Sequence, residues 1–108
     1  MPPMGQKKLH RFAAIKTFSN VLENPVGMPG QWNILFKNNN PIVLELACGK
    51  GEYAVALSKL YQGHNFIGID ITGNRIYVGA KKCRDDNISN LTFLRNQIQK
   101  LPEDFFPG

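Results

Sequence analysis

Two acidic residues and two glycines stand where they could bind a small charged ligand. Glu45 lies in the apolar run 42–46, which leads into a loop that contains Gly49 and Gly51. Asp70 comes near the end of the next apolar run. Glycine lets a ligand lie against the backbone, and an acid at the position of Asp70 can accept hydrogen bonds from the hydroxyls of a ribose. The pattern therefore predicts a nucleoside site.

A third part of this candidate site follows another apolar run. Asn96 and Gln97 come just after residues 91–94. Their side-chain amides both donate and accept hydrogen bonds, which suits the edge of an adenine ring. Together the acids, the glycines and the amides predict a pocket for an adenine nucleoside that carries a charged tail.

Two cofactors match that description, and Glu45 distinguishes between them. Residues 49–54 have the G-x-G-x-x-A spacing of a dinucleotide site. S-adenosylmethionine instead carries an ammonium and a sulfonium group. An acid just before the glycine loop would repel a pyrophosphate and attract these cations, so Glu45 favours S-adenosylmethionine over NAD. Structural roles remain open as alternatives: Glu45 pairing with Lys50, the glycines serving the turn alone, and Asp70 capping the next helix.

The elements that must position these residues follow from the hydrophobic pattern. Short apolar runs predict buried strands at 42–46, 66–71 and 91–94. Apolar residues at helical spacing predict helices or helical turns at 32–37, 52–61, 73–84 and from 101 onward. Thr72 is expected to cap the third of these helices. The β-α-β-α-β order predicts an α/β fold with a parallel sheet, half of a Rossmann-like domain, whose strands end at the edge that binds ligands.

The composition places further limits on function. The chain has 108 residues, enough for one small domain, and a net charge of +5, which favours an anionic partner such as RNA. We find no membrane-spanning run, no secretory signal and no metal site. Cys48 and Cys83 are therefore expected to be free thiols in a cytoplasmic protein.

Residues 1–40 are expected to form a basic N-terminal extension ahead of the domain at 41–108. The first part interleaves basic residues with apolar ones, and Leu9, Phe12 and Ala13 have the spacing of a helical turn. One interpretation is that Phe12 or Phe18 docks on the domain. The other is that four basic side chains contact RNA phosphates: Lys7, Lys8, Arg11 and Lys16.

Four segments resemble the bacterial tRNA (guanine-N7-)-methyltransferases. They are GQWN (30–33), NNNPIVLELACGKGEY (38–53), NFIGIDI (65–71) and NLTFLRN (90–96). The likeness covers residues 24–108 and implies a Rossmann-like methyltransferase that uses S-adenosylmethionine to methylate N7 of a guanine in the tRNA variable loop. It implies that Glu45 is the acid of the first motif, that Asp70 binds ribose, and that Gln97, with Asn96 adjacent, lies beside adenine.

This sequence departs from the family pattern in three ways. Ala47 stands where the family has the first glycine of the loop, and it would cost about 1 kcal/mol if that position needs a positive φ. Gln97 stands where the family usually has Asp. The chain also lacks the family's C-terminal half, so we expect most of the cofactor site and little of the substrate site, without activity from this chain alone. We assign no catalytic residue.

The missing half also predicts an exposed edge. In this topology the strand at 42–46 pairs on both sides, and here one side would be open and apolar. Such an edge invites pairing with another chain. We therefore expect a possible homo-oligomer through this strand.

Overall fold

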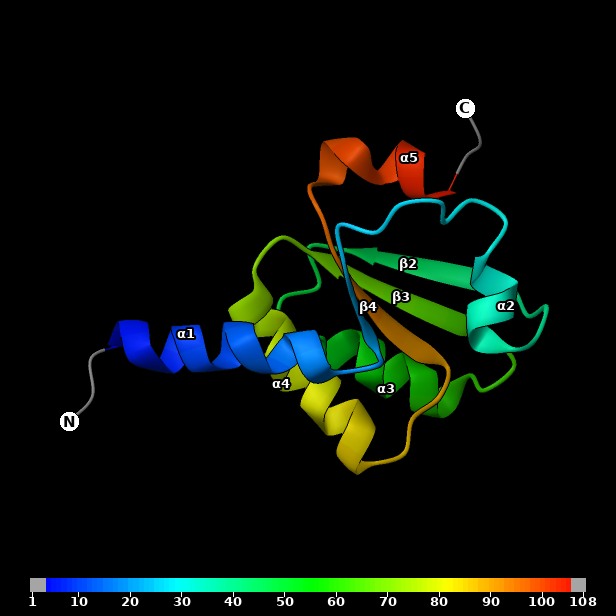
Figure 1. The fold of residues 1–108 in the computed structure, drawn as a ribbon. Coiled ribbons are helices and arrows are strands. Elements are labelled where there is room, and N and C mark those ends of the chain that lie inside the picture. Colours follow the sequence, from blue (N-terminus) through cyan, green and yellow to red (C-terminus); the bar gives the residue numbers. More distant parts are fainter. Residues whose placement is uncertain (1–3, 106–108) are drawn as a thin grey trace.

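A parallel four-stranded sheet forms the centre of the protein (Figure 1). The computed structural model describes residues 4–105, except the side chains of residues 4–7 and 98. The strand order is β1-β4-β3-β2, and every pair of neighbours is parallel. The strands are β1 (Val21–Glu23), β2 (Ile42–Leu46), β3 (Asn65–Asp70) and β4 (Leu91–Arg95). The predicted α/β class and its β-α-β-α-β core are confirmed.

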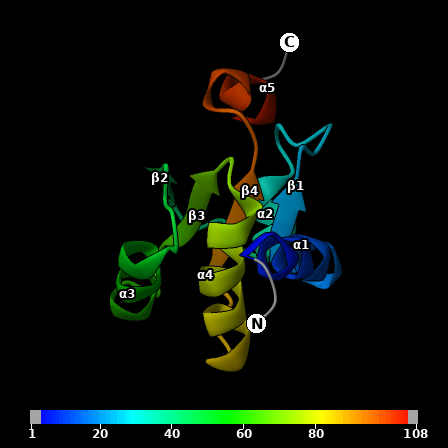
Figure 2. The same ribbon diagram turned by 90° about the vertical axis from the view of Figure 1, so that its left-hand side faces the viewer.

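Helices cover both faces of this sheet. They are α1 (Met4–Ala14), α2 (Trp32–Phe36), α3 (Glu52–Leu60), α4 (Gly73–Asp85) and α5 (Leu101–Phe105), with single 3-10 turns η1 (Ile15–Thr17) and η2 (Ile98–Lys100). Figure 2 shows α1, α3 and α4 on one side of the sheet and α5 on the other. The predicted helices are present, with ends shifted by a residue or so, as expected where helix ends fray.

Side chains of β3 alternate between two apolar clusters, as the pleat of a strand requires. Phe66 faces the cluster under α3 and α4, which includes Phe93 of β4. Ile67 and Ile69 face the opposite cluster, to which α2 contributes Trp32. All six residues of β3 are buried, because this strand has a neighbour on each side and a helical layer on each face.

The ring of Phe93 packs directly against the backbone of three glycines. A Cβ on Gly51 would lie 2.7 Å from the Phe93 ring, and a Cβ on Gly79 would lie 2.7 Å from the ring and 2.5 Å from the carbonyl oxygen of Lys50. A Cβ on Gly68 would lie 3.1 Å from the same ring. These glycines therefore let the loop after β2, strand β3 and helix α4 close around one aromatic side chain.

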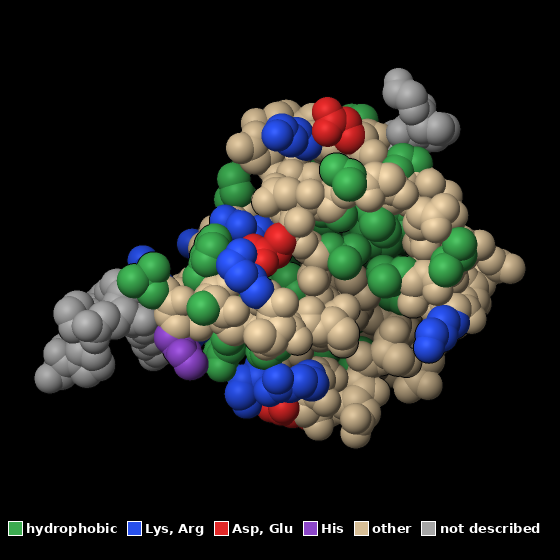
Figure 3. Space-filling model, viewed as in Figure 1, with side chains coloured by type: hydrophobic (Ala, Val, Ile, Leu, Met, Phe, Trp, Pro, Cys, Tyr) green, Lys and Arg blue, Asp and Glu red, His purple; other side chains and the backbone are tan. Residues whose placement is uncertain are grey.

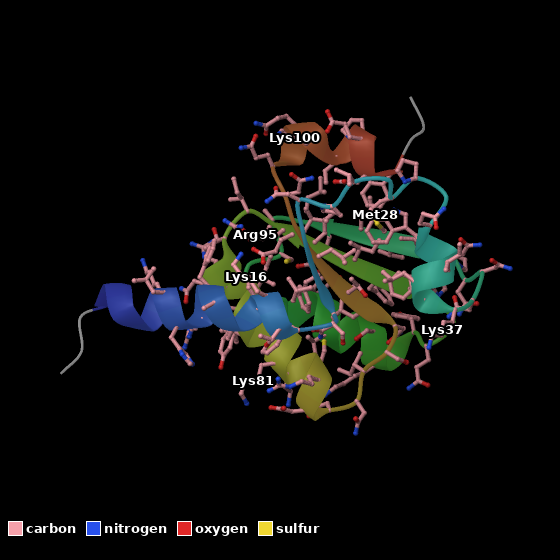
Figure 4. The ribbon with its side chains drawn as sticks, in the orientation of Figure 1. Lys16, Met28, Lys37, Lys81, Arg95 and Lys100 are labelled. Carbon is pink, nitrogen blue, oxygen red and sulfur yellow. The ribbon has the colours of Figure 1, made fainter. Side chains whose placement is uncertain are left out.

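The N-terminal segment packs on the domain, although the sequence did not predict β1. Phe18 is buried, which confirms the docking interpretation for that residue. The Phe12 ring lies under the guanidinium of Arg95, at 4.3 Å. Glu23 of β1 accepts hydrogen bonds from Arg95 and Lys16 at 3.0 and 3.3 Å, and Figure 4 labels both basic residues near α1. The predicted boundary between an extension at 1–40 and a domain at 41–108 stays a prediction. Strand β1, which precedes that boundary, lies in the same sheet as the later strands.

Strand β2 forms an open edge of the sheet, as predicted. Leu44 and Leu46 remain 41% and 52% exposed. Beside this edge lie two apolar hollows of about 330 and 280 Å³, one on each face. Hollow A is lined by Ile42, Leu44, Leu101, Pro102 and Phe105. Hollow B is lined by Val43, Leu57, Tyr61, His64 and Phe66. Figure 3 shows apolar side chains gathered on one side of the molecule below α5.

The start of α4 differs from the sequence prediction. Thr72 occupies the cap position, but its hydroxyl makes no capping hydrogen bond. Asp70 instead accepts a hydrogen bond from the backbone N–H of Thr72 at 2.8 Å. The predicted side-chain cap is therefore wrong, and the backbone N–H of Arg75 donates instead to the Thr72 carbonyl at 3.1 Å.

Candidate functional site

Asp70 joins the glycine loop to the end of β3. Its carboxylate accepts a hydrogen bond from the backbone N–H of Gly49 at 2.7 Å, and its other oxygen accepts the one from Thr72. The side chain is buried. A carboxylate offers about four acceptor positions, so two remain for further donors. The structure thus brings two predicted site residues, Asp70 and Gly49, into direct contact.

Glu45 lies on β2 with one carboxylate oxygen buried and without a partner. Oε2 has no hydrogen-bond partner among the described residues, and the described part of the chain shows no ion pair between Glu45 and Lys50. Burial raises the pKa of the Glu45 carboxyl above its ordinary value. Leaving a buried acceptor unsatisfied costs stability. This arrangement suits a site that receives a positively charged or hydrogen-bond-donating group.

The loop between β2 and α3 uses a left-handed backbone at three positions. Ala47 has φ 54°, Gly49 has φ 57° and Gly51 has φ 73°. The position of Ala47 therefore does need a positive φ, which is the condition under which we expected a cost. The nearest atom to a Cβ on Gly49 would be Arg75 Cδ, at 4.0 Å. Gly49 is thus open to a ligand, whereas Gly51 is required for contact with Phe93.

Cys48 is a buried residue of this loop, close enough to Asp70 and Glu45 to feel their charges. Its backbone N–H donates to the carbonyl of Ile69 at 2.8 Å, which ties the end of β2 to β3. Burial, together with the nearby charges of Asp70 and Glu45, raises the pKa of the Cys48 thiol to about 12. Cys48 is therefore protonated and inert at neutral pH, and both cysteines are free, as predicted.

Asn96 and Gln97 follow β4, but their side chains have different surroundings. Asn96 is buried, and its amide nitrogen donates to Oδ2 of Asp104 at 2.9 Å. Its amide oxygen accepts the backbone N–H of Gln97 at 2.8 Å. Gln97 is exposed, and its side chain accepts a hydrogen bond from Gln99 at 2.9 Å. Gln97 can therefore meet a ligand, while the Asn96 amide bonds to protein groups.

The basic residues of the N-terminal segment are partly engaged with the domain. Arg11 donates to Asn74 at 3.4 Å and lies over the Tyr77 ring, and Lys16 pairs with Glu23. Lys8 is exposed. The side chain of Lys7 lies outside the described residues. The structure does not test RNA contact by these four residues, which stays a prediction.

The candidate site lies at the carboxyl edge of the sheet, at the ends of β2, β3 and β4. Five hollows on the described surface are lined by residues other than Glu45, Asp70 and Gln97. No helix in the described part of the chain is both long and apolar enough to cross a bilayer. Sequence reasoning missed Asp104, and no local signal marks it, because its partner Asn96 lies on another element.

Comparison with known proteins identifies the family. A model of the family described as methyltransferase domain matches residues 37–107. The tRNA (guanine-N(7)-)-methyltransferase of Bacteroides fragilis (strain YCH46) is 40% identical over 97% of this chain and 45% of its own length. That of Christiangramia forsetii is 44% identical over 91% of this chain and 48% of its own length.

Among solved structures, the chain resembles phosphoethanolamine N-methyltransferase 2 of Haemonchus contortus in complex with S-adenosyl-L-methionine. The identity is 20%, the TM-score is 0.48, and the match covers 68% of this chain and 19% of that chain. The chain spans about half the length of the curated relatives it matches. It belongs to the methyltransferase domain family, and relatives similar to it along nearly its whole length are tRNA (guanine-N(7)-)-methyltransferases.

Proposed function

We propose that this chain is the cofactor-binding part of an S-adenosylmethionine-dependent enzyme that methylates N7 of a guanine in the variable loop of tRNA. The observation that carries the proposal is the buried, unpartnered oxygen of Glu45 beside the loop that Asp70 holds in place. A cationic amino-acid tail would satisfy that oxygen. A pyrophosphate would face a carboxylate there, which argues against NAD.

The residues of the chain would divide the work of binding between them. Glu45 would accept the ammonium group of the cofactor, and Gly49 would leave room for the tail against the backbone. Asp70 would use its remaining acceptor positions for the ribose hydroxyls, and Gln97 would lie beside the adenine. Ala47 would shape the loop through its left-handed backbone.

The chemistry at N7 of guanine asks little of these side chains. When bound, the cofactor would supply a methyl group on a sulfonium. Transfer to the N7 lone pair would break the sulfur–methyl bond and leave a neutral thioether, and N7 has no proton to lose. No general base is therefore needed, and the rate depends on holding the two atoms in line. We propose that much of this placement comes from the part of the relatives that has no counterpart here, so this chain alone binds cofactor without turnover.

A cytoplasmic tRNA substrate agrees with the basic charge and the free thiols. Lys8 is exposed and free to approach phosphates, and Lys7, Arg11 and Lys16 stand on the same N-terminal segment. A methylation assay on unmodified tRNA, with this chain compared to a full-length relative, tests the substrate. Methylation by the relative at a guanine outside the variable loop would overturn the assignment of the substrate position.

Calorimetric titration with S-adenosylhomocysteine tests the cofactor. We expect binding that Asp70→Ala and Glu45→Gln each weaken, with Glu52→Gln, on the exposed first turn of α3, as the matched control. NADH should not compete. Absence of heat at millimolar ligand, with protein shown to be folded, would contradict the proposal.

We further propose that the isolated chain self-associates through β2. The strand has unpaired backbone groups along one side, and hollows A and B flank it on opposite faces, as an added strand with alternating apolar side chains requires. Light scattering over a wide concentration range should show a dimer or larger species, and Leu44→Lys should reduce it. A monomer at every concentration would rule this out.

A further inference from the structure

The end of β4 is held by a chain of contacts that reaches α2 through α5. Trp32 donates its indole N–H to the carbonyl oxygen of Asp104 at 2.9 Å, and its ring stacks on Phe105 with centroids 5.1 Å apart. Asp104 in turn accepts a hydrogen bond from Asn96. Trp32, Asp104 and Asn96 are each at most 5% exposed, so water does not compete for these bonds.

This chain of contacts orients the Asn96 amide. The carboxylate of Asp104 can only accept, so it selects the nitrogen of the amide and turns the oxygen toward Gln97. That oxygen accepts the Gln97 backbone N–H at 2.8 Å. The backbone N–H of Asn96 also donates to the carbonyl of Asp70 at 3.2 Å. The turn that presents Gln97 is thus fixed on both sides of Asn96.

We propose that Asp104 is a positioning residue for the base-binding side of the site. It acts through Asn96 to hold Gln97 where an adenine would lie, and it touches neither the ribose nor the tail. This inference rests on the proposed function, and it gives Asn96 a supporting role in place of the ligand contact that the sequence suggested. A charged acceptor makes a stronger hydrogen bond than a neutral one, which explains a buried acid at this position.

The proposal predicts that Asp104 affects binding of the base and not binding of the tail. Two ligands that differ only in the presence of the base can test this. S-adenosylhomocysteine has the base, the ribose and the tail, whereas S-ribosylhomocysteine lacks the base. By NMR titration we expect Asp104→Ala to weaken the first ligand about tenfold, as for loss of one or two hydrogen bonds. The affinity for S-ribosylhomocysteine should change by less than about twofold in the same variant. Asp104→Asn retains an acceptor and should recover most of the difference.

Glu103→Ala is the matched control, because Glu103 is the exposed neighbour on the same helix. Equal weakening of both ligands by Asp104→Ala, or of neither, would overturn the proposal. If Asp104→Ala does not fold, Asn96→Ala removes the same hydrogen bond from the other side. It should likewise weaken S-adenosylhomocysteine and not S-ribosylhomocysteine, and any other result would overturn the proposal.

A ligand-free measurement distinguishes failure of this inference from failure of the proposed function. Amide hydrogen exchange at Gln97 should become faster in Asp104→Ala and stay unchanged in Glu103→Ala. If the wild-type protein binds neither ligand, the cofactor assignment falls, and the positioning role of Asp104 is decided by this exchange rate alone. Unchanged protection of Gln97 in Asp104→Ala would refute it.

Discussion

Replacing Ala47 with glycine should stabilise this protein. Ala47 has φ 54°, in the left-handed region. A residue with a Cβ pays about 1–2 kcal/mol there, while glycine loses about 0.5–1 kcal/mol more backbone entropy on folding than alanine does. The difference predicts that Ala47→Gly raises the free energy of unfolding by about 0.5–1 kcal/mol. In a domain of this size, that is a rise in Tm of roughly 2–8 °C.

Urea denaturation followed by tryptophan fluorescence provides the assay. Trp32 is the only tryptophan and is buried, so its emission reports unfolding. Ala56→Gly is the matched control, because Ala56 is exposed within α3 and its replacement should cost about 1 kcal/mol. Lys37→Gly should also raise the free energy of unfolding, since Lys37 follows the last residue of α2 with φ 63°.

Both replacements change alanine to glycine, but Ala47→Gly should raise the free energy of unfolding and Ala56→Gly should lower it. The reasoning fails if Ala47→Gly destabilises the protein as much as Ala56→Gly does. That result would mean that the loop relaxes away from the left-handed conformation at no cost.

Three further predictions concern this loop and the strand before it. Gly51→Ala should destabilise the protein by about 1–3 kcal/mol more than Gly49→Ala, because only at Gly51 does a new Cβ meet Phe93; equal urea midpoints would contradict this. Because its folded-state pKa is raised, ionised Glu45 lowers stability as pH rises above its unfolded pKa, and the effect is absent at lower pH. Glu45→Gln should therefore be more stable than wild type at pH 7 yet bind the cofactor product less tightly, and the stability gain should vanish in acid; a gain that persists below pH 4 would refute the linkage. Cys48, with its pKa raised to about 12, should resist a thiol reagent at pH 8 until urea is added, and rapid labelling of the folded protein would show that the loop opens.

The sequence predicted the regular elements well because their patterns are local. The run 42–46 matches β2 at both ends, since four apolar residues and Glu45 between turn signals leave little choice. Strand β1 was missed because Val21–Glu23 has only three residues and no period to detect. These residues form a strand because they pair with β4, which lies far along the chain, so no local pattern could indicate it.

Only part of the arrangement of the candidate site residues was predictable from the sequence. The spacing placed Asp70 near the glycine loop, and the structure joins them by a hydrogen bond. The same spacing treated Gly49 and Gly51 alike, although only Gly51 is constrained by Phe93. That constraint comes from a side chain on another strand, so no local pattern could reveal it. The surroundings of Asn96 were unpredictable for the same reason, because its partner Asp104 lies on α5.

The single-sided pairing of β2 couples ligand affinity to local unfolding. Glu45 stands on β2, an edge strand of the described sheet that pairs only with β3, so β2 is expected to detach at a lower free energy than β3 or β4. On the proposed function, each local opening would remove the contact of Glu45 with the ligand without unfolding the domain, and the measured affinity would be multiplied by the fraction of molecules in which β2 is paired. Conversely, a ligand that contacts Glu45 would slow amide exchange along β2, and a strand that pairs with β2 would increase affinity without touching the ligand.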